Sequence, residues 1–366
     1  MQYDNGLSTY SASVHNRNQS HVAAALGKED IMQDKVEGLI HYYFEDAPNY
    51  SAESVPFGLT NLTKIININE RKYVIRIYNQ FTKSMPSIEL ESKITSYLSH
   101  QNLSFQVPVF IRTISGDDYV RFPDGTLGAM VSFLKGHAPD LAEVHHAEEF
   151  GRIVGEITSA LGKFADADGS FTYYGIPFSN IYSIHPLADI PSVKSFFEEP
   201  PFHIPGGDVA FYSEMILSVK NSIDLLEKLP KQFVHHDLLV FNLLAHENKI
   251  KGVLDFDFIS LDVSFMEFAI CLNHVLQMSN GSLEMAEAYI RGYAKYRKAS
   301  SEEITYLQLL TQIYHIAVLH IYIGQHYSGV NVEQNFNYIL NQFKTRNDWL
   351  TEQSSPLQRM FESYLL

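Results

Sequence analysis

The sequence predicts an α+β chain with two lobes: a small antiparallel β-sheet lobe with one helix, then a larger, mainly helical lobe. Two observations predict this fold class. Between residues 58 and 134, short apolar runs are joined by polar turns and include one stretch with helical spacing. Beyond residue 138 long amphipathic stretches dominate, and 366 residues suffice for more than one compact unit.

The small lobe is expected over residues 31–133, after a polar, aperiodic stretch over residues 1–30 that we expect to be a mobile extension. In "GLTNLTKIININERKYVIRIYN", two β-rich runs flank the polar turn "NINERK", which predicts a hairpin. "SIELESKITSYLSHQ" predicts a helix, since Leu90, Ile94 and Leu98 share one face. "DYVRF", "PDG" and "TLGAMVSFL" predict a strand, a turn and a strand.

The large lobe is expected over residues 134–366. Apolar residues line one face of a long helical stretch at Phe150, Ile153, Ile157, Leu161 and Phe164. "FVHHD", "FNLLAH" and "IKGVLDFDF" predict three short strands, with "ENK" as a turn. From Ser264 onward the periodicity predicts helices again.

Composition excludes several classes of protein. A formal net charge of -15 argues against nucleic-acid binding and against anionic membrane surfaces. Cys271 is the only cysteine, so no intrachain disulfide can form and a reducing compartment is expected. No signal peptide and no apolar run of about 20 residues is visible, so we expect a cytoplasmic protein. Nothing in the sequence indicates an oligomeric state.

Polar residues gather within an apolar stretch, "FVHHDLLVFNLLAHENKIKGVLDFDF", where buried carboxylates need compensation. A hairpin from Phe241 to Asp255 would bring Asn242 and Asp255 together, because its two ends are neighbours. One amide oxygen and one or two carboxylate oxygens suit Mg²⁺. Asp237, nearby but separate, is then free to act as a base.

The same residues carry a resemblance to a known family. His235, Asp237 and Asn242 match the kinase catalytic loop "H-x-D-x-x-x-x-N", and Asp255 in "VLDFDF" matches the metal-binding Asp that follows it. The chain resembles the aminoglycoside phosphotransferase and choline kinase-like superfamily over roughly residues 35 to 345. That superfamily includes type II-like homoserine kinases and has a bilobal protein-kinase-like fold.

The resemblance implies a phosphotransferase that uses ATP or GTP with Mg²⁺ to phosphorylate a hydroxyl group of a small-molecule acceptor. Asp237 would be the catalytic base, and His235 would brace the loop. Asn242 and Asp255 would hold Mg²⁺. Asp257 stands where relatives often have a second carboxylate, and is a further candidate metal ligand.

In the small lobe, "YVIRIYN" matches the strand that supplies the phosphate-contacting cation, which makes Arg76 the candidate and Glu91 its helical partner. The turn over the phosphates would be "PFGLTN", with Gly58 and Asn61, although it departs from G-x-G-x-x-G. The hinge expected to receive the adenine is formed by Ser132, Phe133 and Leu134.

Other interpretations compete with this one. Asp237, Asn242 and Asp255 could belong to ordinary turns, where Asp and Asn are common. Asp262 and Glu267 resemble the acidic positions that follow the metal loop in relatives, but helix capping explains them nearly as well. "HHD" also suggests an HD-type metal-dependent phosphohydrolase with His236, Asp237 and Asp255 as ligands, but that site usually lies on helices and needs a further upstream His. A catalytically silent nucleotide-binding pseudokinase is the third option.

The acceptor is suggested only by charge. Between residues 140 and 231 there are fourteen Asp or Glu against six Lys or Arg. An acidic wall there would attract an amine-bearing acceptor such as an aminoglycoside-like antibiotic, an amino alcohol or homoserine.

Overall fold

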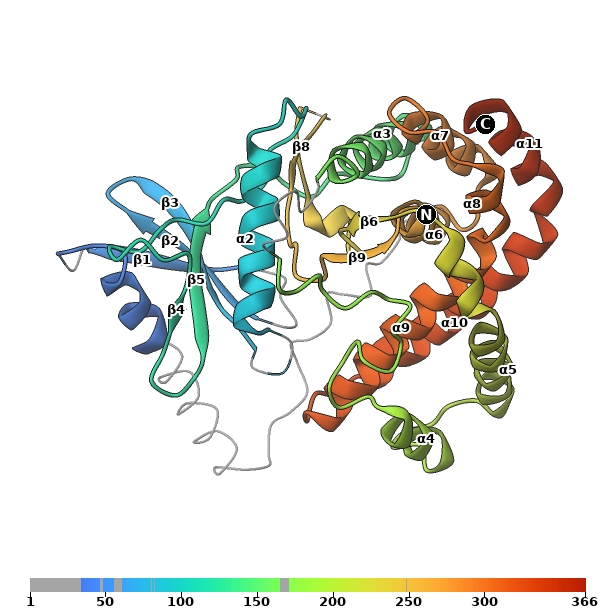
Figure 1. Cartoon of the computed structure of the whole chain (residues 1–366), viewed down its shortest axis with the longest axis horizontal. Coiled ribbons are helices and arrows are strands. Elements are labelled where there is room, and N and C mark those ends of the chain that lie inside the picture. Colours follow the sequence, from blue (N-terminus) through green and yellow to red (C-terminus); the bar gives the residue numbers. More distant parts are fainter. Residues whose placement is uncertain are drawn as a thin grey trace, which may run out of the picture.

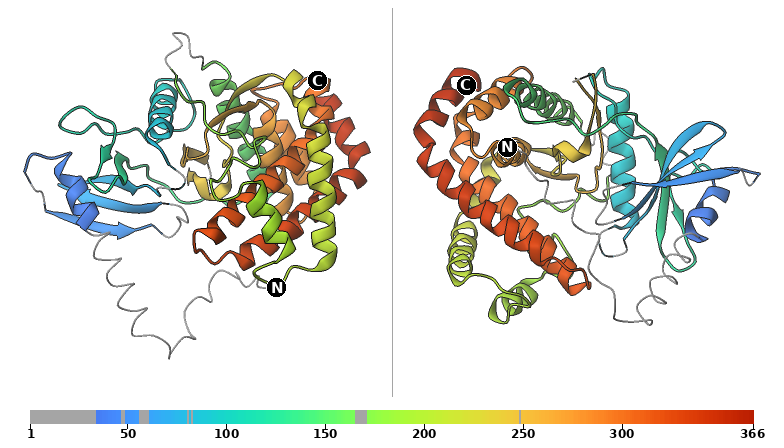
Figure 2. Two further views of the ribbon diagram at one scale, coloured as in Figure 1. Left: turned by 60° about the horizontal axis from the view of Figure 1, so that its bottom comes forward. Right: turned by 180° about the vertical axis from the view of Figure 1, so that it is seen from behind.

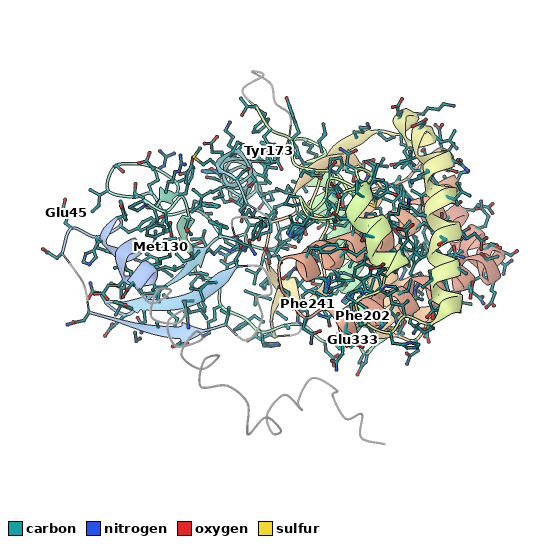
Figure 3. All side chains as sticks on the ribbon, turned by 90° about the horizontal axis from the view of Figure 1, so that it is seen from below. Glu45, Met130, Tyr173, Phe202, Phe241 and Glu333 are labelled. Carbon is teal, nitrogen blue, oxygen red and sulfur yellow. The ribbon has the colours of Figure 1, made fainter. Side chains whose placement is uncertain are left out.

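The computed structural model confirms the predicted α+β, two-lobed architecture (Figure 1). It describes residues 34–46, 49–55, 61–79, 81, 83–164, 171–247 and 249–366. The extension expected over residues 1–30 lies outside the described residues. Figure 3 shows Met130 in the small lobe and Phe202 in the large lobe, with Tyr173 and Phe241 between them.

The small lobe is built on a five-stranded antiparallel sheet with the strand order β1-β2-β3-β5-β4. Its strands are β1 (Tyr50–Ser54), β2 (Leu62–Ile68), β3 (Arg71–Ile77), β4 (Val120–Arg121) and β5 (Leu127–Ser132). The predicted hairpin is confirmed as β2 and β3, with Ile68 paired to Arg71. Asn69 and Glu70 form its two-residue turn with φ of 48° and 64°, the positive values that tight hairpins require.

Helix α2 (Met85–Ser99) confirms the helix predicted in the small lobe and lies between the sheet and the large lobe in Figure 1. It begins at a capping box in which the side chains of Ser84 and Ser87 each bind the other residue's backbone N–H. Its buried face carries Ile88 and Ile94 and also one carboxylate, Glu91. A charged residue on a buried face requires a cationic partner.

After β5 the chain enters the large lobe, which contains nine helices among the described residues. They are α3 (Val144–Leu161), α4 (Ile190–Glu198), α5 (Gly206–Ser222), α6 (Met266–Met278), α7 (Leu283–Tyr293), α8 (Ser301–Thr305), α9 (Leu307–Tyr327), α10 (Glu333–Glu352) and α11 (Ser354–Tyr364). Two 3-10 segments are η1 (Ile223–Lys228) and η2 (Val240–Asn242). Figure 2 shows these helices gathered on one side of the molecule and the small sheet on the other.

Helices α3 and α7 approach closely because glycines lie where they meet. A Cβ atom added to Gly151 would lie 2.1 Å from the carbonyl oxygen of Tyr289. One added to Gly292 would lie 2.0 Å from the carbonyl oxygen of Glu148. No side chain fits at such distances, so the close packing of these two helices requires glycine at both positions.

The large lobe also contains two small antiparallel sheets. One pairs β6 (Lys231–Val234) with β9 (Ser260–Val263), and the other pairs β7 (Leu243–His246) with β8 (Lys249–Val253). The three strands predicted here are therefore shorter than expected. The strand predicted as "FVHHD" ends at Val234, and the one predicted to reach Phe258 ends at Val253. The reason is local: His236 and Asp255 have φ of 68° and 62°, which no β-strand accommodates.

Helix α9 runs through the core of the large lobe. Among the described residues it is the one helix long and apolar enough to cross a membrane, and 72% of its apolar window is buried against other parts of the molecule. Its buried face includes Leu310, Ile313 and Ile316, as the periodicity predicted. Burial of this kind is typical of a core helix in a large domain.

Candidate active site

The catalytic-loop residues lie on the turn that follows β6. The backbone N–H of Leu239 donates to the Asp237 carbonyl at 2.9 Å. Asn242 then fixes Asp237 twice, because its Nδ2 donates to the Asp237 carbonyl and to Asp237 Oδ2, each at 2.8 Å. The Asp237 side chain is thus held in one orientation by Asn242, which sequence analysis had placed beside Asp255 and separate from Asp237.

His235 connects this loop to the next one. Its Nε2 lies 2.9 Å from the carbonyl oxygen of Leu254, and its Nδ1 lies 3.2 Å from the backbone nitrogen of Asp237. Since a carbonyl only accepts and an amide only donates, Nε2 carries the proton and Nδ1 accepts. Burial lowers the pKa of His235 to about 4, so the ring is neutral and keeps that tautomer. The predicted bracing contact is therefore present.

The β7–β8 hairpin brings Asn242 and Asp255 together, as predicted. Leu243 pairs with Val253, and the backbone N–H of Leu254 donates to the Asn242 carbonyl at 2.8 Å. Asp255 then turns out of the hairpin with its positive φ. Burial and the charge of Asp257 raise the pKa of Asp255 to about 6, whereas Arg76 acts to lower it.

Asp237 and Asp255 form a concentration of negative charge. Burial raises the pKa of Asp237 well above its ordinary value, and Asp255 is the next largest cause. Among the described residues, no hydrogen bond reaches Asn242 Oδ1 or Asp255 Oδ2. Hard oxygen donors beside carboxylates that repel one another are what a divalent cation of the Mg²⁺ type binds.

Arg76 lies on β3 and contacts Glu91 on α2, as expected from the sequence. Arg76 Nη1 is 2.6 Å from Glu91 Oε1, and Arg76 Nη2 is 2.9 Å from Asp255 Oδ1. Its charge is thus placed directly beside the candidate metal ligand. Three carboxylates, of Asp257, Glu91 and Asp255, raise the pKa of Arg76 above its ordinary value, although burial opposes them.

Lys83 is a site residue that sequence analysis missed. Its Nζ lies 3.1 Å from Glu91 Oε2, 3.1 Å from Asp257 Oδ1 and 3.2 Å from the Asp257 carbonyl oxygen. The side chain is 1% exposed. Only one sequence signal pointed to it, the presence of a second carboxylate at Asp257 that Arg76 alone does not compensate.

Asn61 and Asp257 contact each other across the two lobes. Asn61 Nδ2 donates to Asp257 Oδ2 at 2.5 Å, and the backbone N–H of Asn79 donates to Asn61 Oδ1 at 3.0 Å. Asn61 was predicted in the turn over the phosphates; in the structure it directly precedes β2, and its side chain binds these two residues. Gly58, predicted in the same turn, lies outside the described residues.

The predicted hinge lies at the end of β5. Ser132 is the last residue of the strand, where its backbone N–H donates to the Val109 carbonyl and its Oγ accepts from the Val109 N–H. Phe133 and Leu134 follow the strand. Backbone N–H and C=O groups can pair with the edge of a base.

The carboxylates of Glu267 and Asp262 contact His235 and His236 at the start of the catalytic loop. Glu267 Oε2 accepts the backbone N–H groups of His235 and His236 at 2.7 and 3.2 Å. Asp262 Oδ2 lies 3.0 Å from His236 Nε2 and accepts the Phe178 N–H at 2.9 Å. These contacts decide the interpretation that sequence analysis left open, since neither carboxylate caps a helix through its side chain.

The HD-type alternative is wrong for His236. Its Nδ1 lies 3.0 Å from the Phe258 carbonyl and its Nε2 faces Asp262, so both ring nitrogens are occupied by protein acceptors. In the part of the chain that the structure describes, no group of three or more His, Cys, Asp or Glu residues is arranged to hold a metal. A metal ligated mainly by protein side chains, as that alternative requires, has no site there.

Comparison with protein families gives a match over residues 51–302, more than half of the chain, to the model described as "Phosphotransferase enzyme family". The chain belongs to this phosphotransferase family. It is a small-molecule kinase, in agreement with the resemblance found in its catalytic loop.

Curated relatives of this phosphotransferase include homoserine kinases. The one from Sinorhizobium fredii is 22% identical over 296 residues, which cover 77% of this chain and 81% of that protein. The homoserine kinase from Zymomonas mobilis is 22% identical over 283 residues, covering 75% of this chain and 80% of that protein.

Solved structures show the same fold. A microcompartment-associated aminopropanol kinase superposes with a TM-score of 0.67 at 14% identity, over 90% of this chain and 98% of that one. An amicoumacin kinase in complex with AMP-PNP, Ca²⁺ and Ami gives 0.62 at 15% identity, over 90% and 96%. Choline kinase from Cryptosporidium parvum gives 0.55 at 16% identity, over 86% and 93%.

Proposed function

We propose that this kinase transfers the γ-phosphoryl group of ATP to a hydroxyl group of a small, amine-bearing acceptor, with Asp237 as the catalytic base. The observation that carries the proposal is the fixation of Asp237 by Asn242 beside Asp255. A half-buried carboxylate with a raised pKa, held in one orientation, suits removal of a proton from an attacking hydroxyl.

Mg²⁺ would be held by Asn242 and Asp255 and would offset charge on the phosphate oxygens. The donor set fits it, since an amide oxygen and a carboxylate oxygen are available there among the described residues. Support for a metal–nucleotide pair comes from the amicoumacin kinase, whose structure contains AMP-PNP and Ca²⁺. Asp257 is less suited to this role, because its oxygens are directed at Lys83 and Asn61.

The nucleotide would lie between the lobes. Arg76, anchored by Glu91, would contact the phosphates, and the backbone of Phe133 and Leu134 would receive the adenine. Residues 31–133 would then form the nucleotide-binding lobe and residues 134–366 the catalytic and acceptor-binding lobe.

The acceptor proposal rests on relatives and on aromatic side chains near the base. Homoserine, aminopropanol and choline, named for the relatives, all combine a hydroxyl group with a nitrogen cation. Burial and then the charge of Asp237 raise the pKa of Tyr314 and of Tyr322 on α9. Aromatic faces beside a carboxylate suit an ammonium group.

The acidic wall suggested by composition gives no support here. Two of the described acidic residues of that interval pair with cations elsewhere: Glu148 with Arg291 and Lys295, and Asp208 with Lys344. The carboxylates that act on Asp237 belong to Asp255, Asp257 and Glu267 instead.

The test begins with thermal unfolding in ATP or GTP, with and without Mg²⁺, followed by ADP-release assays over homoserine, amino alcohols and aminoglycosides. Mg²⁺-dependent stabilisation by ATP and release of ADP with one acceptor class are expected. Asp255→Ala should weaken Mg²⁺–ATP binding in calorimetry. An absence of any nucleotide response, or unchanged affinity in Asp255→Ala, contradicts the proposal.

A further inference from the structure

We infer that Lys83 and Asp257 form a clasp between the lobes that positions Glu91 and, through it, Arg76 for contact with the nucleotide phosphates. This deepens the proposed function and rests on it. The clasp assigns a positioning role to a lysine outside the kinase motifs. It also assigns Asp257 to that role and removes it from the metal ligands.

The contacts of Asp257 point to the small lobe. Its Oδ1 lies 3.1 Å from Lys83 Nζ and 3.4 Å from Arg76 Nη1, and its Oδ2 accepts from Asn61 Nδ2 at 2.5 Å. The side chain is 7% exposed. Although Asp257 belongs to the loop after β8 in the large lobe, both of its carboxylate oxygens are thus used by side chains of the small lobe.

Lys83 is placed where a lysine is unfavourable without these partners. It directly precedes the N-cap Ser84 of α2, and the N-terminal end of a helix carries partial positive charge. Its ammonium group is also removed from water, which is unfavourable for a charge without an ionic partner. Glu91 and Asp257 compensate both effects, and their charges raise the pKa of Lys83 against the effect of burial.

The two carboxylate oxygens of Glu91 each bind a different cation, Arg76 or Lys83. Oε1 binds Arg76 Nη1 at 2.6 Å and Oε2 binds Lys83 Nζ at 3.1 Å. Arg76 keeps Nη2 on Asp255, next to the place proposed for the phosphates. Without Lys83, Asp257 and one oxygen of Glu91 would lose their main cation, and Arg76, already 3.4 Å from Asp257, would be drawn toward them.

The inference is tested with Lys83→Met, Asp257→Asn and the double variant, each assayed for Mg²⁺–ATP affinity, kcat and dependence on free Mg²⁺. We expect each single variant to weaken ATP affinity by about tenfold and the double variant to be no weaker than the worse single one, because one contact is lost in all three. Half-saturation by Mg²⁺ should stay unchanged. Lys35→Met is the matched control, since Lys35 pairs with the exposed Asp124 away from the site.

Two results would overturn the clasp. Additive losses in the double variant would mean that Lys83 and Asp257 act independently. A raised Mg²⁺ requirement in Asp257→Asn, present also when Lys83 is Met, would make Asp257 a metal ligand.

A readout without nucleotide separates this inference from the proposed function. The same cycle measured on the free energy of unfolding in denaturant should show coupling between Lys83 and Asp257. Coupling in unfolding without any nucleotide binding by the unmodified protein would refute the proposed reaction and leave only the structural clasp. Nucleotide binding without coupling in either measurement would refute the clasp and leave the kinase.

Discussion

Asp237 combines two properties that oppose each other in most carboxylates. It is held rigidly by Asn242, and its negative charge is disfavoured by burial and by Asp255. Proton transfer to such a base is favourable, because protonation of Asp237 removes its repulsion with Asp255. The hydrogen bond from Asn242 keeps the carboxyl group in the same orientation. Asp237 is therefore suited to remove a proton from a hydroxyl group that is bound next to it.

Asp237→Asn should reduce kcat by several orders of magnitude, on the scale of about 10² to 10⁴ for loss of a general base, and leave nucleotide affinity nearly unchanged. The substitution keeps the shape and removes the proton acceptor. ADP release and calorimetric titration with Mg²⁺–ATP measure the two quantities. Turnover close to that of the unmodified protein would show that another group takes the proton.

At the scale of elements, the first turn of α6 anchors the catalytic loop through a side chain. Glu267 accepts two consecutive backbone N–H groups, of His235 and of His236. His236 has a positive φ, a conformation that costs on the order of 1 kcal/mol or more for a residue other than glycine. The loop geometry is therefore maintained by a side chain of a neighbouring helix.

Glu267→Ala should lower kcat with little change in nucleotide affinity and destabilise the protein by about 1 to 3 kcal/mol, because buried N–H groups lose their acceptor. Glu267→Gln, which retains an amide oxygen, should recover most of both losses. Steady-state kinetics and denaturant unfolding measure them. Equal defects in the two variants would mean that the negative charge matters and the hydrogen bonds do not.

The contact between α3 and α7 is a second element-scale dependence. Gly151→Ala should destabilise the large lobe by several kcal/mol, about 2 to 4, since the new methyl group would meet the Tyr289 carbonyl. Gly207→Ala in α5 is the control, as no atom lies within 4 Å of its added Cβ and a helix gains up to about 1 kcal/mol from alanine. Denaturant midpoints that shift in the same direction for both variants would contradict the packing account.

At the scale of the whole molecule, the response to acid is the sum of two opposing sets of groups. Burial lowers the pKa of His235, His274 and His320 to about 4 and that of His315 to about 3. Neutral histidines of this kind stabilise the fold above pH 6.5, and this contribution is lost as pH falls toward 4. Asp237 and Asp255 act in the opposite direction, because their raised pKa values favour the folded state at low pH.

A variant isolates the histidine contribution. His315 stacks on Phe343 at a ring distance of 5.0 Å, so His315→Phe should keep the packing and remove one titrating group. Below pH 6.5 the unmodified protein should lose stability relative to this variant by about 1.4 kcal/mol per pH unit. Denaturant unfolding followed through Trp349, the only tryptophan, measures this difference at each pH. A difference that stays constant between pH 7.5 and pH 5 would show that His315 binds its proton equally in the folded and unfolded states.

Much of the fold followed from the sequence because its signals are local. The β2–β3 hairpin and α2 arise from alternation, helical spacing and a capping serine within short stretches. The meeting of Asn242 with the Asp255 loop followed from hairpin geometry alone. The Arg76–Glu91 pair followed from the resemblance of "YVIRIYN" to the strand that supplies the phosphate-contacting cation, together with a carboxylate on an apolar helix face.

What could not be predicted depends on contacts between distant segments. Lys83 precedes a helix and has no period, and its two carboxylates come from α2 and from a loop 174 residues away. The early ends of β6 and β8 depend on positive φ at His236 and Asp255, which Glu267 and Arg76 stabilise from other elements. Apolar runs in the sequence continue through these positions and conceal the turns.

Cys271 on α6 is fully buried, and its Sγ donates to the carbonyl of Leu238 inside the catalytic loop. Burial also raises the pKa of this thiol well above its ordinary value, so almost no thiolate forms in the folded chain. A thiol reagent can react only after this helix and the loop above it separate. The rate of labelling at Cys271 therefore reports how often the catalytic loop separates from α6. A bound ligand that holds the loop against α6 would slow the labelling.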